Sequence, residues 1–218
     1  RYLKPEWQTL GSIYSIGLPA IVMQILTPIM SYTLNLILGA ISVSAVTAYG
    51  VYYKLQNFIF MPGYGLNNAS IPIISYNFGA RNKQRVSQTV RYGLIYVSVI
   101  MLIGIALLQL FARQIVGIFS VTEESHQLCV LALRIITCGF FFAGANIILQ
   151  GVCQALGKGI YSLVISLLRF IVLALPMAWV LSLTENAASL VWLSLPVAEA
   201  GACVAAILLT RKIYRKAL

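Results

Sequence analysis

Four charged side chains lie inside long apolar stretches of the sequence, where a lipid environment should reject them. They are Lys54, Arg134, Arg169 and Glu199, and Glu199 falls near the middle of its stretch. Each costs about 2.5 to 3.5 kcal/mol at the centre of a membrane span unless a partner or water satisfies it. Glu199 is therefore a candidate for a carboxylate that binds a proton or a cation, or for the acidic member of an ion pair with Arg169 or Lys54. Since one carboxylate cannot neutralise three cations, the others need water, carbonyls or acids outside this chain, unless Lys54 and Arg134 extend toward the membrane surface.

Uncharged polar side chains recur at helical spacing in the same stretches. The first stretch holds Gln24, Thr27, Ser31 and Asn35, the fourth holds Asn146, Gln150 and Gln154, and the fifth holds Ser162 and Ser166 before Arg169. Residues three or four apart share one face of a helix, so each set forms a polar stripe. Such stripes either join helices by hydrogen bonds or line a cavity. The cavity candidates are Gln24, Asn35, Gln56, Asn146 and Gln150.

The residue types that catalysis and metal binding require are scarce. The chain has one histidine, His126, no aspartate, and four cysteines without the spacing of a metal site. A histidine-based metal site, a Ser-His-Asp triad and a disulfide framework are therefore not expected. We expect neither an enzyme nor a resident cofactor or metal.

The composition indicates a membrane protein. Of the 218 residues, 60% are hydrophobic and only 9% are charged, whereas about 25% are charged in a soluble domain. Because about 20 apolar residues cross a bilayer, the chain has room for about six spans and no soluble domain. The apolar stretches cover residues 10–38, 43–78, 90–111, 128–156, 161–183 and 190–209. The expected fold class is all-α, with residues 1–218 forming a single polytopic unit of six transmembrane helices.

The second stretch is too long for one straight span and contains Pro62 and Pro72, so it is either two spans or one long interrupted helix. The cations favour one helix. With a single span there, Arg113 stands alone on one side, and eleven cations fall on the other: Arg1, Lys4, Arg81, Lys83, Arg85, Arg91, Lys158, Arg211, Lys212, Arg215 and Lys216. The positive-inside rule then places both termini in the cytoplasm, with the protein in the plasma or inner membrane.

The position of the cations in the connections between spans explains the net charge of +10. Cations beside membrane spans face anionic phospholipid headgroups, so we expect lipid rather than nucleic acid as the charged partner. Trp7, Trp179 and Trp192 lie near the ends of expected spans, which predicts that they anchor the chain at the membrane surface. The alternative is that they are ordinary core aromatics.

Several motifs resemble one transporter family. The specific ones lie at the end of the second stretch: Pro62-Gly63-Tyr64-Gly65-Leu66 and Tyr76-Asn77-Phe78-Gly79-Ala80-Arg81. Supporting ones are Gly17-Leu18-Pro19, Gln154-Ala155-Leu156-Gly157-Lys158, Leu168-Arg169-Phe170 and Pro196-Val197-Ala198-Glu199. Together they resemble the second half of a multidrug and toxic compound extrusion (MATE) transporter, over nearly the whole chain.

The resemblance implies a twelve-helix protein of two six-helix lobes with a substrate cavity between them. It implies export of organic, often cationic, compounds in exchange for H⁺ or Na⁺. The implied partners are an N-terminal six-helix lobe, which this chain lacks, together with small-molecule substrates and membrane lipids. The first residue is Arg1 rather than methionine, which also suggests part of a longer protein.

One departure from the family pattern concerns ion coupling. In the Na⁺-coupled branch, a glutamate on the first helix of this lobe and an aspartate on its fourth helix contribute to cation binding. The corresponding regions here hold Gln24 to Leu26 and Ala145 to Asn146, without a carboxylate. Coupling through those two positions is therefore not expected in this lobe.

Two function hypotheses remain. The first is half of a multidrug efflux antiporter. The second is a flippase for lipid-linked sugars built on related lobes, whose polyanionic cargo would suit Lys54, Arg134 and Arg169 facing the cavity. An intramembrane enzyme or a passive scaffold is disfavoured because the sequence has no cluster of catalytic residues.

Overall fold

The computed structural model describes residues 6–217. Within this range every regular element is a helix, which confirms the all-α class. The elements are α1 (Trp7–Ile41), α2 (Val43–Gly79), α3 (Lys83–Leu110), α4 (Ala112–Gly117), α5 (Glu123–Thr137), α6 (Phe140–Ala155), α7 (Gly159–Leu167), the π-helix η1 (Leu168–Ala174), α8 (Leu175–Ser182), α9 (Ala187–Leu190), the 3-10 helix η2 (Val191–Leu193) and α10 (Ser194–Ala217).

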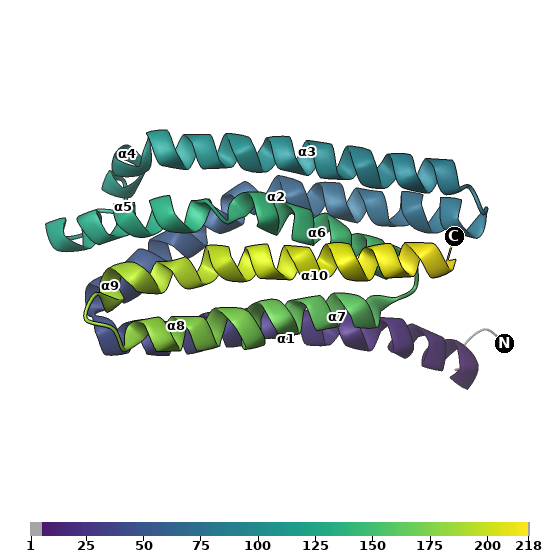
Figure 1. The fold of residues 1–218 in the computed structure, drawn as a ribbon, viewed down its shortest axis with the longest axis horizontal. Helices are drawn as coiled ribbons and strands as arrows, with labels where there is room; N and C mark the ends of the chain where they lie inside the picture. The colour runs from purple at the N-terminus through teal and green to yellow at the C-terminus, as the bar shows by residue number, and fades with distance from the viewer. Residues whose placement is uncertain (1–5, 218) are drawn as a thin grey trace.

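The long elements lie side by side as a bundle (Figure 1). α1, α2, α3 and α10 each run along it alone, whereas α5 continues into α6, and α7 continues through η1 into α8. α1 begins and α10 ends at the same end of the bundle, at the right of Figure 1. This is the arrangement that an even number of passes produces.

Four helical segments in the described range are long and apolar enough to cross a membrane: Gly17–Ile41, Lys83–Leu110, Gly159–Ser182 and Ala187–Tyr214. α5 and α6 qualify together as a fifth, although they are bent by 49° at their junction. α2 is long enough, at 37 residues, but it does not meet the same test of apolarity. It packs along α3, α5 and α6, and much of its surface remains exposed, including Phe58, Met61 and Tyr76.

α2 differs from its expected form. The sequence predicts one long interrupted helix, but the helix continues without a break through Pro62 and Pro72. Both prolines are exposed on its surface. Each removes one backbone hydrogen bond, and its ring crowds the carbonyl of the residue four positions earlier, which bends a helix without ending it. In Figure 1, α2 accordingly runs obliquely in its first part and along the bundle in its later part.

The break occurs instead in the fourth stretch, between α5 and α6. Gly139 at this junction is buried, and a Cβ atom there would lie 2.8 Å from the Cα atom of Pro196 in α10. Only glycine allows the two backbones to approach so closely. The bend thus lies at a close contact between segments that are far apart in the sequence.

Gly139→Ala should therefore destabilise the full-length protein by about 1 to 3 kcal/mol, the usual cost of forcing an extra methyl into a packed site. The new atom meets backbone, which cannot rotate away as a side chain can. Gly117→Ala is the matched control, because a Cβ there meets nothing within 4 Å. Thermal unfolding of both variants in detergent should show a lower midpoint for Gly139→Ala alone, and equal midpoints would contradict the argument.

The three tryptophans divide into two classes. Trp7 and Trp179 are 81% and 59% exposed, as expected of residues at a membrane surface. Trp192 is 1% exposed, and its Nε1 donates a hydrogen bond to the Ala188 carbonyl oxygen at 2.7 Å. The prediction of a surface anchor is wrong for Trp192, because η2 turns its indole into the core.

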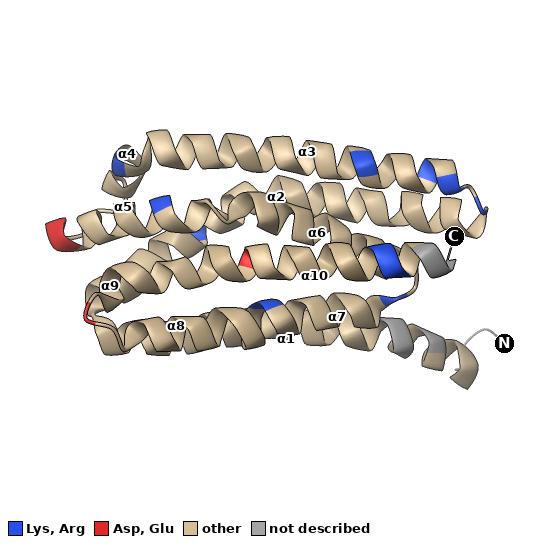
Figure 2. Cartoon of the chain, in the orientation of Figure 1, with Lys and Arg blue, Asp and Glu red and all other residues tan. Residues whose placement is uncertain are grey.

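Apart from Lys54, Arg134, Arg169 and Glu199, the described charged residues lie toward the two ends of the bundle (Figure 2). One end carries the basic residues of the α2–α3 and α6–α7 connections and of the last turns of α10: Arg81, Lys83, Arg85, Lys158, Arg211 and Lys212. The opposite end carries Arg113 with Glu123, Glu124 and Glu185. Arg1 and Lys4, and the side chains of Arg215 and Lys216, lie outside the described part of the chain. The single pass of α2 thus brings the described basic connections to one end, which we call the basic end.

Candidate functional site

A cavity of about 80 Å³ lies inside the bundle, walled by α1, α2, α5, α6, η1 and α10. Arg169 and Glu199 are the only charged residues in its lining. A water molecule needs about 10 to 15 Å³ of such space, so the cavity holds several waters or a partly hydrated ion. It is smaller than the roughly 300 Å³ or more of typical sites for drug-sized ligands.

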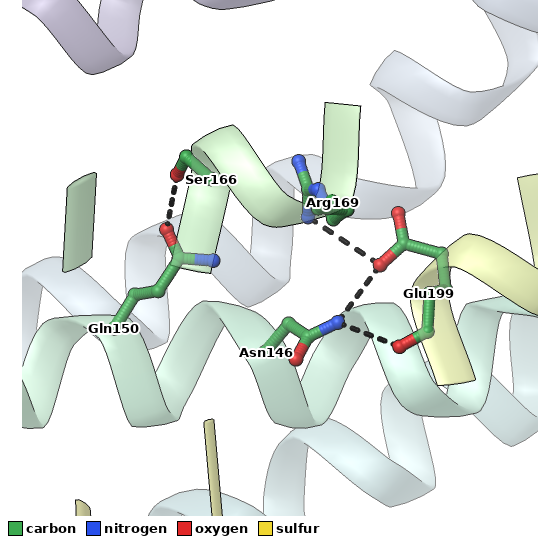
Figure 3. A network of polar contacts seen from close by, with 5 residues as sticks. All are labelled: Asn146, Gln150, Ser166, Arg169 and Glu199. Carbon is green, nitrogen blue, oxygen red and sulfur yellow. Dashed lines mark hydrogen bonds and ion pairs between the residues drawn. The ribbon is translucent and has the colours of Figure 1, made fainter. Parts of the chain in front are cut away.

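Glu199 is held from two sides, as Figure 3 shows. Its Oε2 accepts hydrogen bonds from Asn146 Nδ2 of α6 at 2.9 Å and from Arg169 Nη1 of η1 at 3.4 Å. Asn146 Nδ2 also donates to the backbone oxygen of Glu199 at 3.0 Å. The side chains of Arg169 and Glu199 retain 15% and 17% of their exposure. Of the two ion pairs considered for Glu199, the structure contains the one with Arg169.

Arg169 occupies an unusual position in the backbone. It lies in the π-helix η1, which widens the helix inside the fifth stretch, and such segments are often found at functional sites. Its guanidinium carbon stands 4.1 Å from the centre of the Phe170 ring, close enough for a cation–π interaction. Arg169 is therefore fixed on one side by an aromatic ring and on the other by the carboxylate.

Two buried polar atoms of this network have no hydrogen-bond partner in the described structure: Asn146 Oδ1 and Arg169 Nε. The first is an acceptor and the second is a donor. Since buried polar groups are normally satisfied, these atoms are places where water or an ion can bind. The cavity thus contains one cation and one carboxylate. Asn146 is fully buried and holds Glu199 from behind, but unlike the prediction it does not itself line the cavity.

Gln150 belongs to a separate contact. Its Oε1 accepts a hydrogen bond from Ser166 Oγ at 2.9 Å, and its backbone oxygen accepts one from Ser162 Oγ at 2.7 Å. These bonds join α6 to α7, and Gln150 is not in the lining of the cavity. For Gln150 the structure therefore favours a role in joining helices by hydrogen bonds rather than in lining the cavity.

The other candidates are divided between the cavity and the surface of the lobe. Gln56 lines the cavity, as does Thr27 from the first stripe. Gln24 is exposed, and Asn35 donates to the Ser31 carbonyl oxygen of its own helix at 2.9 Å. Neither residue lines this cavity, so a role for Gln24 or Asn35 toward a second lobe stays a prediction.

Lys54 and Arg134 are both exposed and do not join Arg169 in the cavity. The Lys54 ammonium lies 5.8 Å from the centre of the Phe119 ring, in the connection that follows α4. Arg134 lies in the last turn of α5. The structure therefore favours the alternative in which Lys54 extends along the protein, and the cavity contains one cation rather than three.

Four of the five tyrosines of α2 were missed as site residues. Tyr49, Tyr52, Tyr53 and Tyr64 all line the cavity, and the Tyr49 hydroxyl donates to Ser31 Oγ of α1 at 3.3 Å. With Gln56 and Phe60, Tyr49, Tyr53 and Tyr64 recur every three or four residues along α2, which places them on one face. This spacing was available from the sequence and could have identified this wall of the cavity.

Comparison with known proteins agrees with this architecture. The family model for MatE matches residues 19–180. The chain is 26% identical over 206 residues to the multidrug export protein MepA of Staphylococcus aureus (strain NCTC 8325 / PS 47), covering 94% of this chain and 45% of the relative. It is also 26% identical over 208 residues to MepA of Staphylococcus saprophyticus, covering 95% of this chain and 46% of that protein. The chain thus spans about half the length of the curated relatives it matches.

Solved structures show the same fold. An outward-facing multidrug resistance MATE family transporter of the MOP superfamily superposes with a TM-score of 0.93 at 20% identity, over 100% of this chain and 49% of that one. The Vibrio cholerae MATE transporter VcmN in its bent form superposes with a TM-score of 0.91 at 24% identity, over 98% of this chain and 48% of that one. Because the family model matches most of its length, this chain belongs to the MATE family of multidrug efflux transporters.

Proposed function

We propose that this chain is one six-helix lobe of a secondary active efflux antiporter that exports organic cations in exchange for H⁺ or Na⁺. The observation that carries the proposal is Glu199, a carboxylate inside a water-sized cavity whose only counter-charge is Arg169 of the same chain. The similarity to the two MepA proteins, which are described as multidrug export proteins, supports the transport class.

The cavity size assigns different places to the ion and the substrate. About 80 Å³ accommodates a hydrated ion but not a drug-sized molecule. The substrate therefore binds between this lobe and an N-terminal lobe, and the coupling ion binds within this one. Gln24 and Asn35, which do not line the inner cavity, remain candidates for the surface toward the substrate.

The ion pair supplies a way to couple the two events. In the described state Arg169 acts as a tethered cation on Glu199. When a proton or Na⁺ binds the Glu199 carboxylate, Arg169 loses its attraction to that group, and the balance between conformations changes by the difference in ion affinity between them. Antiport needs such an ion-dependent change in the lobe that borders the substrate site.

The separation of charges supports the orientation. We place the basic end in the cytoplasm, because cytoplasmic connections are enriched in Lys and Arg. Both termini then face the cytoplasm, in the plasma or inner membrane. A flippase for lipid-linked sugars gains no support from the cavity, since its single cation is already paired.

Dye transport by the full-length protein tests the proposal. Proteoliposomes should move a fluorescent organic cation against its gradient when an inward H⁺ or Na⁺ gradient is imposed, and movement should stop when that gradient is collapsed. Liposomes without protein are the control. Transport that persists with both gradients collapsed, or no transport under either gradient, would contradict antiport.

A further inference from the structure

A second, larger cavity lies at the basic end, between the last turns of α2 and the first turns of α3. It has a volume of about 400 Å³, on the same measure that gives about 80 Å³ for the cavity containing Glu199. It is lined by Ile73, Asn77, Arg85, Gln88, Thr89 and Tyr92. None of these residues is acidic. We call it the α2–α3 groove, and it is separate from the cavity that contains Glu199.

Arg85 gives the groove an uncompensated positive charge. Its guanidinium has no ion-pair or hydrogen-bond partner in the described part of the chain, where the single ion pair is Arg169 with Glu199. Glu123, Glu124 and Glu185 lie at the opposite end of the bundle (Figure 2). A guanidinium with free donors binds phosphate oxygens well, because its N–H groups match their geometry.

The neighbouring side chains add donors for the same kind of ligand. Asn77 Nδ2 and Thr89 Oγ1 donate within their own helices, to the Ile73 oxygen at 2.8 Å and the Arg85 oxygen at 2.9 Å. The Gln88 amide and the Tyr92 hydroxyl remain as donors beside Arg85. The groove is therefore rich in donors, and a phosphate group complements it.

An apolar strip continues from the groove along α3. Tyr96, Val99 and Ile103 are 56%, 49% and 55% exposed, and with Arg85, Gln88 and Tyr92 they recur every three or four residues on one face. From Tyr92 to Ile103 the helix rises about 17 Å, close to half of the roughly 30 Å hydrocarbon thickness of a bilayer. A free phosphate would make no contact with this strip, whereas the acyl chain of a phospholipid in one leaflet is long enough to cover it.

The rings at the boundary fit the same position in the membrane. Tyr92 and Tyr96 stack with their centroids 6.3 Å apart, between the charged part of the groove and the aliphatic strip. Tyrosine is favoured at this level of a bilayer, where its ring is in lipid and its hydroxyl is near the headgroups. The order along α3 is thus cation, amphipathic ring and aliphatic residue, which is the order of chemistry along a phospholipid.

We infer that the α2–α3 groove binds one anionic phospholipid, with the headgroup phosphate on Arg85 and Gln88 and an acyl chain along Tyr96, Val99 and Ile103. The inference does not depend on the transported substrate or the coupling ion. Other cations of the basic end attract anionic lipid in general, but the groove adds a specific position for one molecule.

The test is a titration of the purified full-length transporter in detergent with phosphatidylglycerol, phosphatidylcholine or inorganic phosphate, read as the shift in thermal unfolding midpoint. Phosphatidylglycerol should stabilise the protein at lower concentration than phosphatidylcholine, and inorganic phosphate should have no comparable effect. Arg85→Gln should weaken the apparent affinity for phosphatidylglycerol about tenfold, since hydrogen bonds to charged groups are worth about that factor. Equal effects of phosphate and phosphatidylglycerol would overturn the lipid as occupant, and equal effects of the two lipids would overturn the selectivity for anions.

Two further variants separate a defined site from general charge attraction. Arg91→Gln removes the same charge from the same helix, but position 91 lies about 120° around the helix from position 85, and Arg91 does not line the groove. It should leave the affinity within about twofold of the wild type. Gln88→Leu removes a donor without changing the charge and should weaken binding about threefold, in line with a neutral hydrogen bond. A loss with Arg91→Gln equal to that with Arg85→Gln, or no loss with Gln88→Leu, would overturn the defined site.

Discussion

Glu199→Gln is expected to reduce coupled dye efflux by the full-length protein at least about tenfold, since positioned proton-transfer groups contribute factors of this size or more. The amide has nearly the shape of the carboxylate and can still accept the hydrogen bond from Asn146 Nδ2. It cannot take up a proton at neutral pH or supply a negative charge to Na⁺. The loss should therefore appear in transport while the protein still folds.

Glu185→Gln is the matched control for this variant. Glu185 is exposed, lies at the end of the bundle opposite the basic end, and has no ion-pair partner among residues 6–217. Efflux by this control should equal that of the wild type. Efflux by Glu199→Gln that is as fast as wild type and equally dependent on the ion gradient would remove Glu199 from the coupling mechanism.

Arg169→Gln is expected to destabilise the protein by about 2 to 4 kcal/mol, because it leaves the Glu199 carboxylate without its counter-charge. Breaking a fully buried ion pair by removing one partner costs about 3 to 5 kcal/mol. The expected value is lower here because the two side chains retain 15% and 17% exposure, and water screens part of the charge. Thermal or denaturant unfolding of the full-length protein in detergent measures the effect.

The double variant Arg169→Gln with Glu199→Gln identifies the cause. Removing both charges should recover most of the stability, so the two substitutions should not be additive. Arg113→Gln serves as the control for loss of a cation, because Arg113 is exposed at the opposite end from the basic end. If the losses in stability of the two single variants instead add up in the double variant, the cost of Arg169→Gln does not come from leaving the Glu199 charge unpaired.

The sequence predicts those features of the fold that depend on local periodicity and on charge. Apolar stretches of spanning length predicted the all-α class, and the cations predicted that the second stretch is a single helix, as α2 is. The charges inside the apolar stretches also indicated two ion-pair partners for Glu199, Arg169 or Lys54, and Arg169 is the one found. These predictions rest on the lengths of the apolar stretches and on the positions of the charged residues, and both can be read directly from a sequence.

Features that depend on contacts between distant segments could not be predicted in this way. The bend between α5 and α6 lies where Pro196 of α10 approaches Gly139, and Trp192 is buried from the turn η2. Gln150 and Asn146 have the same spacing signal, yet the first bonds α7 and the second bonds Glu199. Helical spacing identifies the face of a helix, but the neighbour that meets this face is set by the tertiary packing.

The unbroken form of α2 has a mechanical consequence. A helix of 37 residues is about 55 Å long, so it exceeds the roughly 30 Å thickness of bilayer hydrocarbon. Its residues from Tyr49 to Tyr64 carry the tyrosines that line the ion cavity, and its last turns carry Asn77 of the α2–α3 groove. Its first part crosses the bundle obliquely, and its later part runs beside α3 (Figure 1). Because its helical turns continue through both prolines, α2 joins the two sites within one element. A displacement of its last turns by lipid at one membrane face can therefore be transmitted to the tyrosines that line the cavity.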